Sequence, residues 1–140
     1  MRKLRIFRMR HFLFIFAAVA LAAGCNGKKA RQLITDPIVE REIRRQLGKP
    51  EGELTKTDLG KVKELILSGT KLTDEGLEEV AKLKNLSKLS LQVNDITDEG
   101  LKEVAKLTQL ERVQLYETNV TEEGVADLQK ALPDCKIDWP

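Results

Sequence analysis

Residues 86–101 read LSKLSLQVNDITDEGL, and the same order of residue types recurs 24 positions earlier and 24 positions later. Apolar residues, a threonine and a glycine return at fixed places in all three copies. The clearest triplets are Leu65, Leu89 and Val113; Leu67, Leu91 and Leu115; Leu72, Ile96 and Val120; Thr73, Thr97 and Thr121; and Gly76, Gly100 and Gly124. Many independent positions repeat in step without a gap, so the chain contains an array of similar structural units.

Each unit changes its hydrophobic period halfway along. In the first unit, residues 65–67 (LIL) alternate between inward and outward positions, which predicts a short strand, and the later apolar residues return at helical spacing. Thr73 suits the helix N-cap, and Asp74 and Glu75 follow it, where acids favour the positive end of the helix dipole. The next residue, Gly76, costs about 1 kcal/mol in a helix. Its return in every unit indicates a place where the backbone packs closely.

The spacing Leu86-x-x-Leu89-x-Leu91-x-x-Asn94 resembles the leucine-rich-repeat family, and in particular short bacterial proteins with T-D-x-G-L repeats. The resemblance is strong over residues 61–140 and looser over 36–60. It implies an α/β solenoid with a short parallel sheet on the concave face and helices on the convex face. The neighbouring units carry Thr70 and Thr118 in place of Asn94, so we expect threonine to bond the backbone turn there.

Both ends of the array look capped, as a solenoid requires if its core is not to be exposed. Asp36 and Pro37 read as the N-cap and first residue of a helix with one apolar stripe, and Gly48 ends it. This segment resembles the N-terminal cap of internalin-type repeat proteins. At the other end, Ile137 and Trp139 fall 24 residues after Val113 and Leu115, which predicts a final strand with the tryptophan over the open core.

The first 25 residues indicate export. A basic start is followed by the apolar run FLFIFAAVALAA at 12–23, then Gly24 and Cys25. Twelve helical residues reach roughly 18 Å, short of the ~30 Å hydrocarbon layer, which favours a secretory signal peptide over a membrane-spanning anchor. Leu21-Ala22-Ala23-Gly24-Cys25 resembles the lipobox of bacterial lipoproteins, with Ala22 where leucine is usual. The resemblance implies a lipid on Cys25; the alternative is an ordinary signal peptide with a chance cysteine.

The predicted organisation therefore has five parts. They are a signal peptide at 1–24, the lipidated Cys25 with its tether at 25–34, an N-terminal cap at 35–60, three leucine-rich repeats at 61–132 and a C-terminal capping strand at 133–140. The predicted location is the cell envelope, on a membrane surface. In a bacterium with two membranes, Asn26 after the cysteine resembles the signal for the outer membrane, at its periplasmic face.

Composition argues against several functions. Five of the 24 basic residues lie within the first ten positions, ahead of all 22 acidic residues, so the body is mildly acidic and ill suited to nucleic acid. The only histidine, His11, lies in the leader, and Cys135 is expected to be a buried, inert thiol. We identify no catalytic residue, metal ligand or cofactor site. The chain is predicted not to be an enzyme, and a hydrolase is the remote alternative.

What remains is the concave face, where outward strand residues form columns across the units. Leucine-rich repeats generally bind protein partners there, and tyrosine and arginine often anchor interfaces. The predicted protein-binding residues are Ile66, Lys88, Gln92, Arg112, Gln114 and Tyr116. The predicted function is an exported, lipid-anchored, monomeric module that binds a protein of unknown identity. The alternative is a structural envelope lipoprotein without a dedicated ligand.

Overall fold

Each repeat folds into a short strand followed by a helix, so the leucine-rich-repeat solenoid predicted from the sequence is confirmed. The computed structural model describes residues 32–140, and the leader with Cys25 lies outside the described residues. Within that part of the chain, the strands are β1 (Glu64–Ile66), β2 (Lys88–Ser90), β3 (Arg112–Gln114) and β4 (Lys136–Asp138). The helices are α1 (Pro37–Leu47), α2 (Lys56–Leu59), α3 (Asp74–Val80), α4 (Asp98–Val104) and α5 (Glu122–Ala131).

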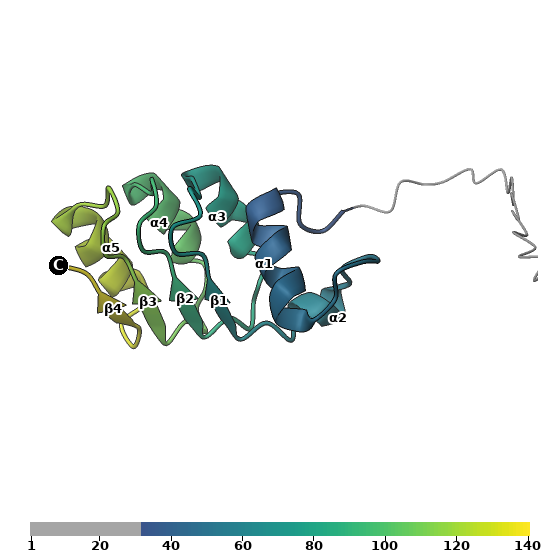
Figure 1. Ribbon diagram of the computed structural model, residues 1–140. Helices are drawn as coiled ribbons and strands as arrows, with labels where there is room; N and C mark the ends of the chain where they lie inside the picture. The colour runs from purple at the N-terminus through teal and green to yellow at the C-terminus, as the bar shows by residue number, and fades with distance from the viewer. Residues whose placement is uncertain (1–31) are drawn as a thin grey trace, which may run out of the picture.

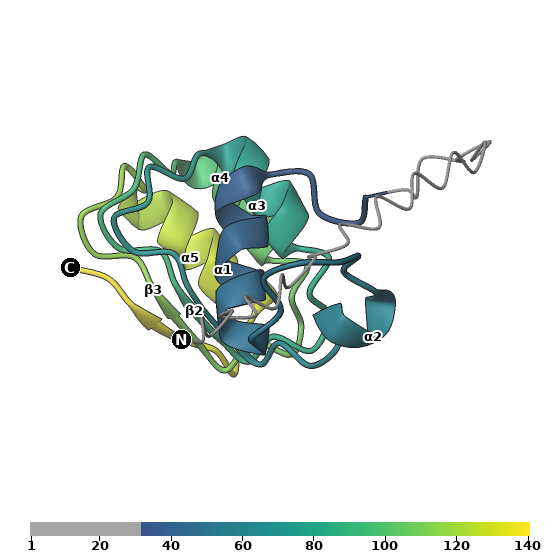
Figure 2. The ribbon, with the colours of Figure 1, turned by 45° about the vertical axis from the view of Figure 1, so that its right-hand side comes forward.

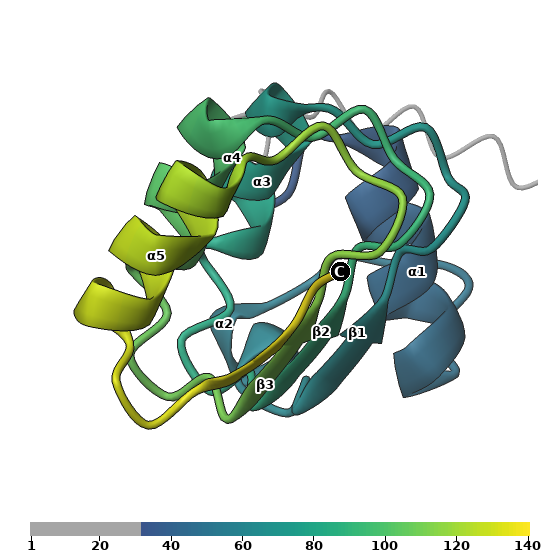
Figure 3. The same cartoon turned by 90° about the vertical axis from the view of Figure 1, so that its left-hand side faces the viewer.

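The strands form one parallel sheet in the order β1-β2-β3-β4 (Figure 1). The register joins residues 24 apart, for example Leu65 with Leu89 and Leu89 with Val113. Helices α3, α4 and α5 lie along the opposite side of the solenoid (Figure 3). The central strand leucines and the inward residues of these helices are buried together in one continuous core. No helix among residues 32–140 has the length and apolar character needed to cross a membrane.

Consecutive units are joined on the helical side by a contact that we call the Asp–Thr clamp. Asp74 accepts hydrogen bonds from the backbone N–H of Thr97 (2.9 Å) and from its hydroxyl (2.6 Å). Asp98 accepts the same pair from Thr121, at 2.8 and 2.7 Å. The hydrogen bonds from Thr121 lower the pKa of the Asp98 carboxyl below its ordinary value. Each aspartate at a helix start therefore fastens the start of the next helix.

The clamp explains the recurring glycine in the second and third units, whereas at Gly76 a Cβ would instead meet Leu72 Cδ1 at 2.4 Å. A Cβ on Gly100 would lie 2.3 Å from Asp74 Oδ1, and one on Gly124 would lie 2.1 Å from Asp98 Oδ1. No side chain fits there while the aspartate is in place, so the close packing expected at this position is confirmed. The last unit carries Glu122 where the others carry aspartate. Within the described chain no helix follows α5, so Glu122 has no further threonine to hold.

A second set of contacts supports the turns after the strands. The buried Asn94 accepts from Leu72 N–H (2.9 Å) and donates to the carbonyls of Leu67 (2.8 Å) and Leu91 (2.9 Å). Where threonine replaces it, the hydroxyls of Thr70 and Thr118 each donate to a carbonyl three residues earlier, at 2.7 Å. The expectation that threonine bonds the turn is therefore confirmed. Asn94 joins two units, whereas the Thr118 bond stays within its own.

The cap helix α1 closes the N-terminal end of the solenoid (Figure 2). Asp36 caps it by accepting from the N–H groups of Ile38 and Val39, and Gly48 ends it with φ of 61°. Val39 and Ile43 are fully buried. At the other end Trp139 packs partly buried against the core, as expected for a residue that covers an open end.

The segment that enters the domain is fixed before α1 begins. Thr35 donates to the Glu79 carboxylate through its N–H (2.9 Å) and its hydroxyl (3.0 Å). Lys82 Nζ donates to the same carboxylate (2.7 Å) and to the carbonyl of Leu33 (3.0 Å). Burial alone would raise the pKa of Glu79, but the hydrogen bonds from Lys82 and Thr35 lower it below its ordinary value. This Glu79 lock attaches the entering chain directly to α3.

The Asp–Thr clamp predicts an unusual effect of alanine. Ala is normally favoured over Gly in a helix by about 1 kcal/mol. Gly100→Ala should instead lower the free energy of unfolding by about 1–3 kcal/mol, because the methyl group displaces Asp74 and Leu77 from a tightly packed site. Urea unfolding followed by circular dichroism measures the difference. Gly60→Ala is the matched control, since its Cβ would meet nothing closer than 3.5 Å. Equal stability of both variants would contradict the clamp.

Candidate functional site

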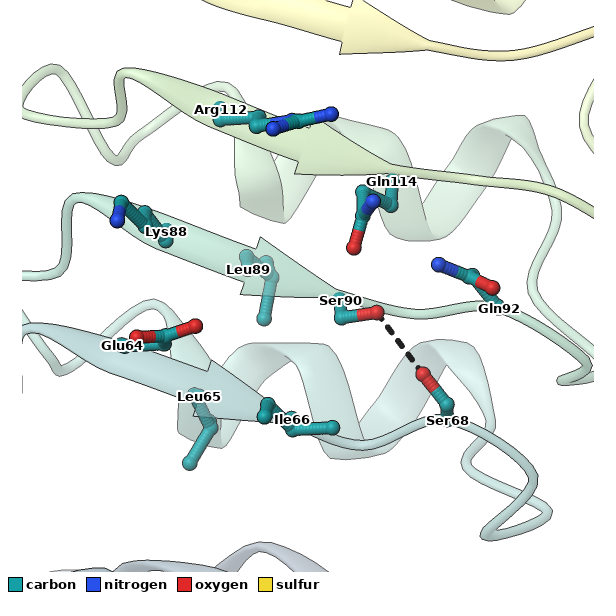
Figure 4. A pocket seen from close by; sticks show the side chains of 10 residues that line it. All are labelled: Glu64, Leu65, Ile66, Ser68, Lys88, Leu89, Ser90, Gln92, Arg112 and Gln114. Atoms are coloured by element: carbon teal, nitrogen blue, oxygen red, sulfur yellow. Dashed lines mark hydrogen bonds between the residues drawn. The ribbon is translucent and has the colours of Figure 1, made fainter.

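The outward side chains of the sheet form the concave face in two columns set by the strand register. One column contains Glu64, Lys88, Arg112 and Lys136, and the next contains Ile66, Ser90, Gln114 and Asp138. Ser68, Gln92 and Tyr116 stand two residues beyond the second column in their units. Figure 4 shows Ile66, Lys88 and Gln114 on neighbouring strands, and Gln92 just beyond the end of β2, around a common depression. The alternation of buried and outward residues follows from the pleat of each strand.

The depression has a volume of about 390 Å³ and lies over β1, β2 and β3. Five of the six residues predicted from the sequence line it, namely Ile66, Lys88, Gln92, Arg112 and Gln114. The sixth, Tyr116, follows β3 and is 41% exposed. The structure therefore brings all six to one surface. A role in binding stays a prediction.

Two members of the second column are less accessible than their outward position suggests. Ser90 is 8% exposed, and its hydroxyl is hydrogen-bonded to that of Ser68 at 2.8 Å. Asp138 is 9% exposed. Its carboxylate accepts from Arg112 Nε at 2.5 Å and lies 3.3 Å from Lys136 Nζ. These two residues support the surface and offer little area to a ligand.

The Arg112–Asp138 pair changes the interpretation of Arg112. The sequence predicts that Arg112 is available to contact a partner. In the structure Arg112 also neutralises the nearly buried carboxylate of Asp138. The hydrogen bond from Arg112, with a further one from Lys136, lowers the pKa of Asp138 below its ordinary value. Replacing Arg112 would leave Asp138 poorly compensated and destabilise the sheet. A substitution at Arg112 is therefore unsuitable as a test of binding alone.

Val93 belongs to the same surface and was not among the predicted residues. It is 52% exposed, and its N–H donates to the carbonyl of Tyr116 at 3.0 Å. Its φ is +56°, a left-handed conformation that is strained for a β-branched residue. The repeat alignment carries the signal that could have found it, since Gly69 stands at the same place in the first unit, with φ of +66°. The chain places a valine where a glycine would be unstrained.

The rest of the described chain offers little for catalysis. Among residues 32–140 no group of three or more His, Cys, Asp or Glu side chains is placed to hold a metal ion. Cys135 is buried, and burial raises the pKa of its thiol to about 11, so it is protonated at neutral pH and a poor nucleophile. That the chain is not an enzyme stays a prediction.

A parallel sheet with one strand and one helix per unit, joined by Asn94 and by Asp–Thr clamps, is the leucine-rich-repeat fold. The family model described as "Leucine Rich repeat" matches residues 61–81 and 82–105, which are the first two units. No curated protein matches the sequence.

Solved structures show the same architecture. An internalin (inlF) from Listeria monocytogenes is 23% identical, with a TM-score of 0.59, over 76% of this chain and 30% of that protein's chain. Internalin C2 from the same organism is 23% identical, with a TM-score of 0.53, over 75% of this chain and 54% of that one. This chain thus spans only part of each internalin, and at this identity the likeness shows the fold alone.

The Asp138 contacts predict a change of stability with pH. A carboxyl with a lowered pKa stabilises the fold above its ordinary value near 3.8, and this contribution is lost as the pH falls through its lower value in the folded chain. Asp138→Asn should therefore lower the melting temperature at pH 7, and the gap from the unaltered chain should shrink below pH 4. Thermal melts from pH 7 to pH 3 measure it. Asp127→Asn on exposed α5 should show little gap at any pH. A gap for Asp138→Asn that stays constant over this range would contradict the assignment.

Proposed function

We propose that this chain is an exported, membrane-anchored leucine-rich-repeat module that binds a protein partner through its concave face. One observation carries the binding part. The large hydrophobic side chains that are exposed among residues 32–140 are Ile66, Val93 and Tyr116. Ile66 lines the depression, and Val93 and Tyr116 follow β2 and β3 beside it. The convex helices present charged residues instead. An apolar group gathered on one surface, with polar side chains around it, is typical of an interaction site.

The architecture supports a protein as the ligand. Solenoids of this kind use their concave surface for binding, and leucine-rich-repeat proteins are typically interaction modules. The surface is small, because four short strands bury about 600–800 Å² on a partner, the low end for a stable complex. A partner of modest affinity therefore suits this face better than a permanent subunit. We expect the module to be monomeric.

Anchoring rests on the sequence of the leader, with its basic start, short apolar run and Cys25. Two or three acyl chains would hold the protein stably, whereas one would not. Ile34 is buried in the core and Lys82 holds the carbonyl of Leu33, so the tether is shorter than the predicted 25–34. Residues 26–32 span at most roughly 25 Å when fully extended, so the module would work close to its membrane. The Glu79 lock at Thr35 then sets where the tether meets the domain. We place the protein in the cell envelope, at the outer membrane if there are two membranes.

Site-directed photocrosslinking in intact cells tests the binding face. Benzoylphenylalanine in place of Tyr116 lies on the concave face, and the same residue in place of Lys102 lies on exposed α4 as the matched control. We expect one discrete crosslinked protein from position 116 and none from position 102. The same crosslinks from both positions, or none from either, would favour the structural envelope lipoprotein without a dedicated ligand.

Lipidation has its own test. Cells expressing the full chain are labelled with a clickable palmitate, and the membrane fraction is analysed. The native chain and Cys135→Ser should both incorporate the label, whereas Cys25→Ser should not. Labelling of Cys25→Ser, or no labelling of the native chain, would contradict the lipid anchor.

A further inference from the structure

Three cations stand in register on neighbouring strands of the concave face. Lys88 pairs with Arg112, and Arg112 pairs with Lys136, in the β2-β3-β4 register. Neighbouring strands lie about 4.8 Å apart, and like charges directly opposite one another destabilise a sheet. Folding alone gives no reason to stack three cations in one column. A ligand that brings negative charge would relieve the repulsion.

The acids on this face form ion pairs at only one end of that column. Asp138 is engaged by Arg112 and Lys136 together. Glu64 is in register with Lys88 but makes no ion pair with it. Among residues 32–140 Lys88 has no acidic partner, although it is exposed. Glu64, in register with Lys88, offsets part of its charge without an ion pair, so the three cations and two acids of this face leave a net charge of +1 in a body that is mildly acidic overall.

Arg112 keeps hydrogen-bond donors free for a ligand. Asp138 holds it through Nε, and within the described chain no hydrogen bond engages its two terminal guanidinium nitrogens. The side chain is 47% exposed, so these nitrogens are open to solvent. A guanidinium fixed through one nitrogen loses less freedom when it binds a carboxylate with the others.

The remaining side chains of the face suit an extended peptide. Gln92 and Gln114 point into the depression (Figure 4), and their amide groups make no hydrogen bond within residues 32–140. Such amides can donate to and accept from a peptide backbone. Beyond them, Tyr116 and the strained, exposed Val93 form an apolar end. Tyr116 lies four residues after Arg112, which is about 13 Å along an extended chain.

We propose that the concave face binds an extended acidic segment of its protein partner. Acidic side chains of the segment pair with Arg112 and with Lys88, and an apolar side chain four residues from the acid on Arg112 rests on Tyr116 and Val93. This inference rests on the proposed function and names the chemistry of the partner. A basic peptide or an uncharged polymer would leave Lys88 without an ion pair.

Selection from a random peptide library tests the proposal. The probe is a phage display library of twelve-residue peptides, panned against the full-length chain in detergent. We expect enrichment of peptides with an acidic residue four positions from an aromatic or large aliphatic one. Retention of the selected peptides should fall at least about tenfold on Lys88→Glu, because that change turns a charge-assisted hydrogen bond into repulsion. Lys102→Glu, which alters an exposed lysine of α4, should retain them like the unaltered chain.

The outcomes separate the two proposals. Lys88→Met removes the positive charge without adding the negative charge that Lys88→Glu introduces. Circular dichroism checks that each variant is folded. Enrichment of basic or uncharged peptides, no enrichment at all, or equal retention by Lys88→Glu would overturn the acidic-segment proposal. If crosslinking from position 116 still yields one partner, the concave face remains a binding site and only its charge preference is wrong. If both experiments fail, the proposed function fails with them.

Discussion

The structure depends on how closely successive helices can approach, and the Asp–Thr clamp sets that approach. Asp74 and Asp98 each reach across to the next helix start, and Gly100 and Gly124 leave the space that the carboxylates occupy. With the helices held at this spacing, the strands on the other side pair in a register of 24 residues. The register in turn produces the columns of the concave face. Surface chemistry on one side of the molecule thus follows from a packing constraint on the other.

Much of this was accessible from the sequence, because a repeat reports the same environment several times. The 24-residue period predicted the fold, the outward columns and the threonines that replace Asn94. It also indicated close packing at the glycines, but not the contact responsible. The aspartates were assigned to the helix dipole, since a single sequence does not show that Asp74 meets Thr97, 23 residues away. Long-range side-chain contacts appear only when the units are stacked.

The candidate site was predictable in outline and less so in detail. Strand alternation placed Ile66, Lys88 and Arg112 on one face, and the structure agrees. Alternation does not say how deeply a residue lies, so the near-burial of Asp138 and its hold on Arg112 were missed. Val93 was not among the predicted site residues, although Gly69 at the same place in the first unit carries a signal of its left-handed backbone.

The Glu79 lock has a mechanical consequence. A pull that arrives from the residues before Gln32 meets an exposed side-chain hydrogen bond from Gln32 to Glu40 of α1 and then the contacts of Leu33 with Lys82 and of Thr35 with Glu79. The force is therefore shared by the cap helix and the first repeat. Two hydrogen bonds to one carboxylate and one from Lys82 carry it into the repeat before the backbone of α1 is loaded. A force on the short tether therefore leaves the shape of the concave face unchanged.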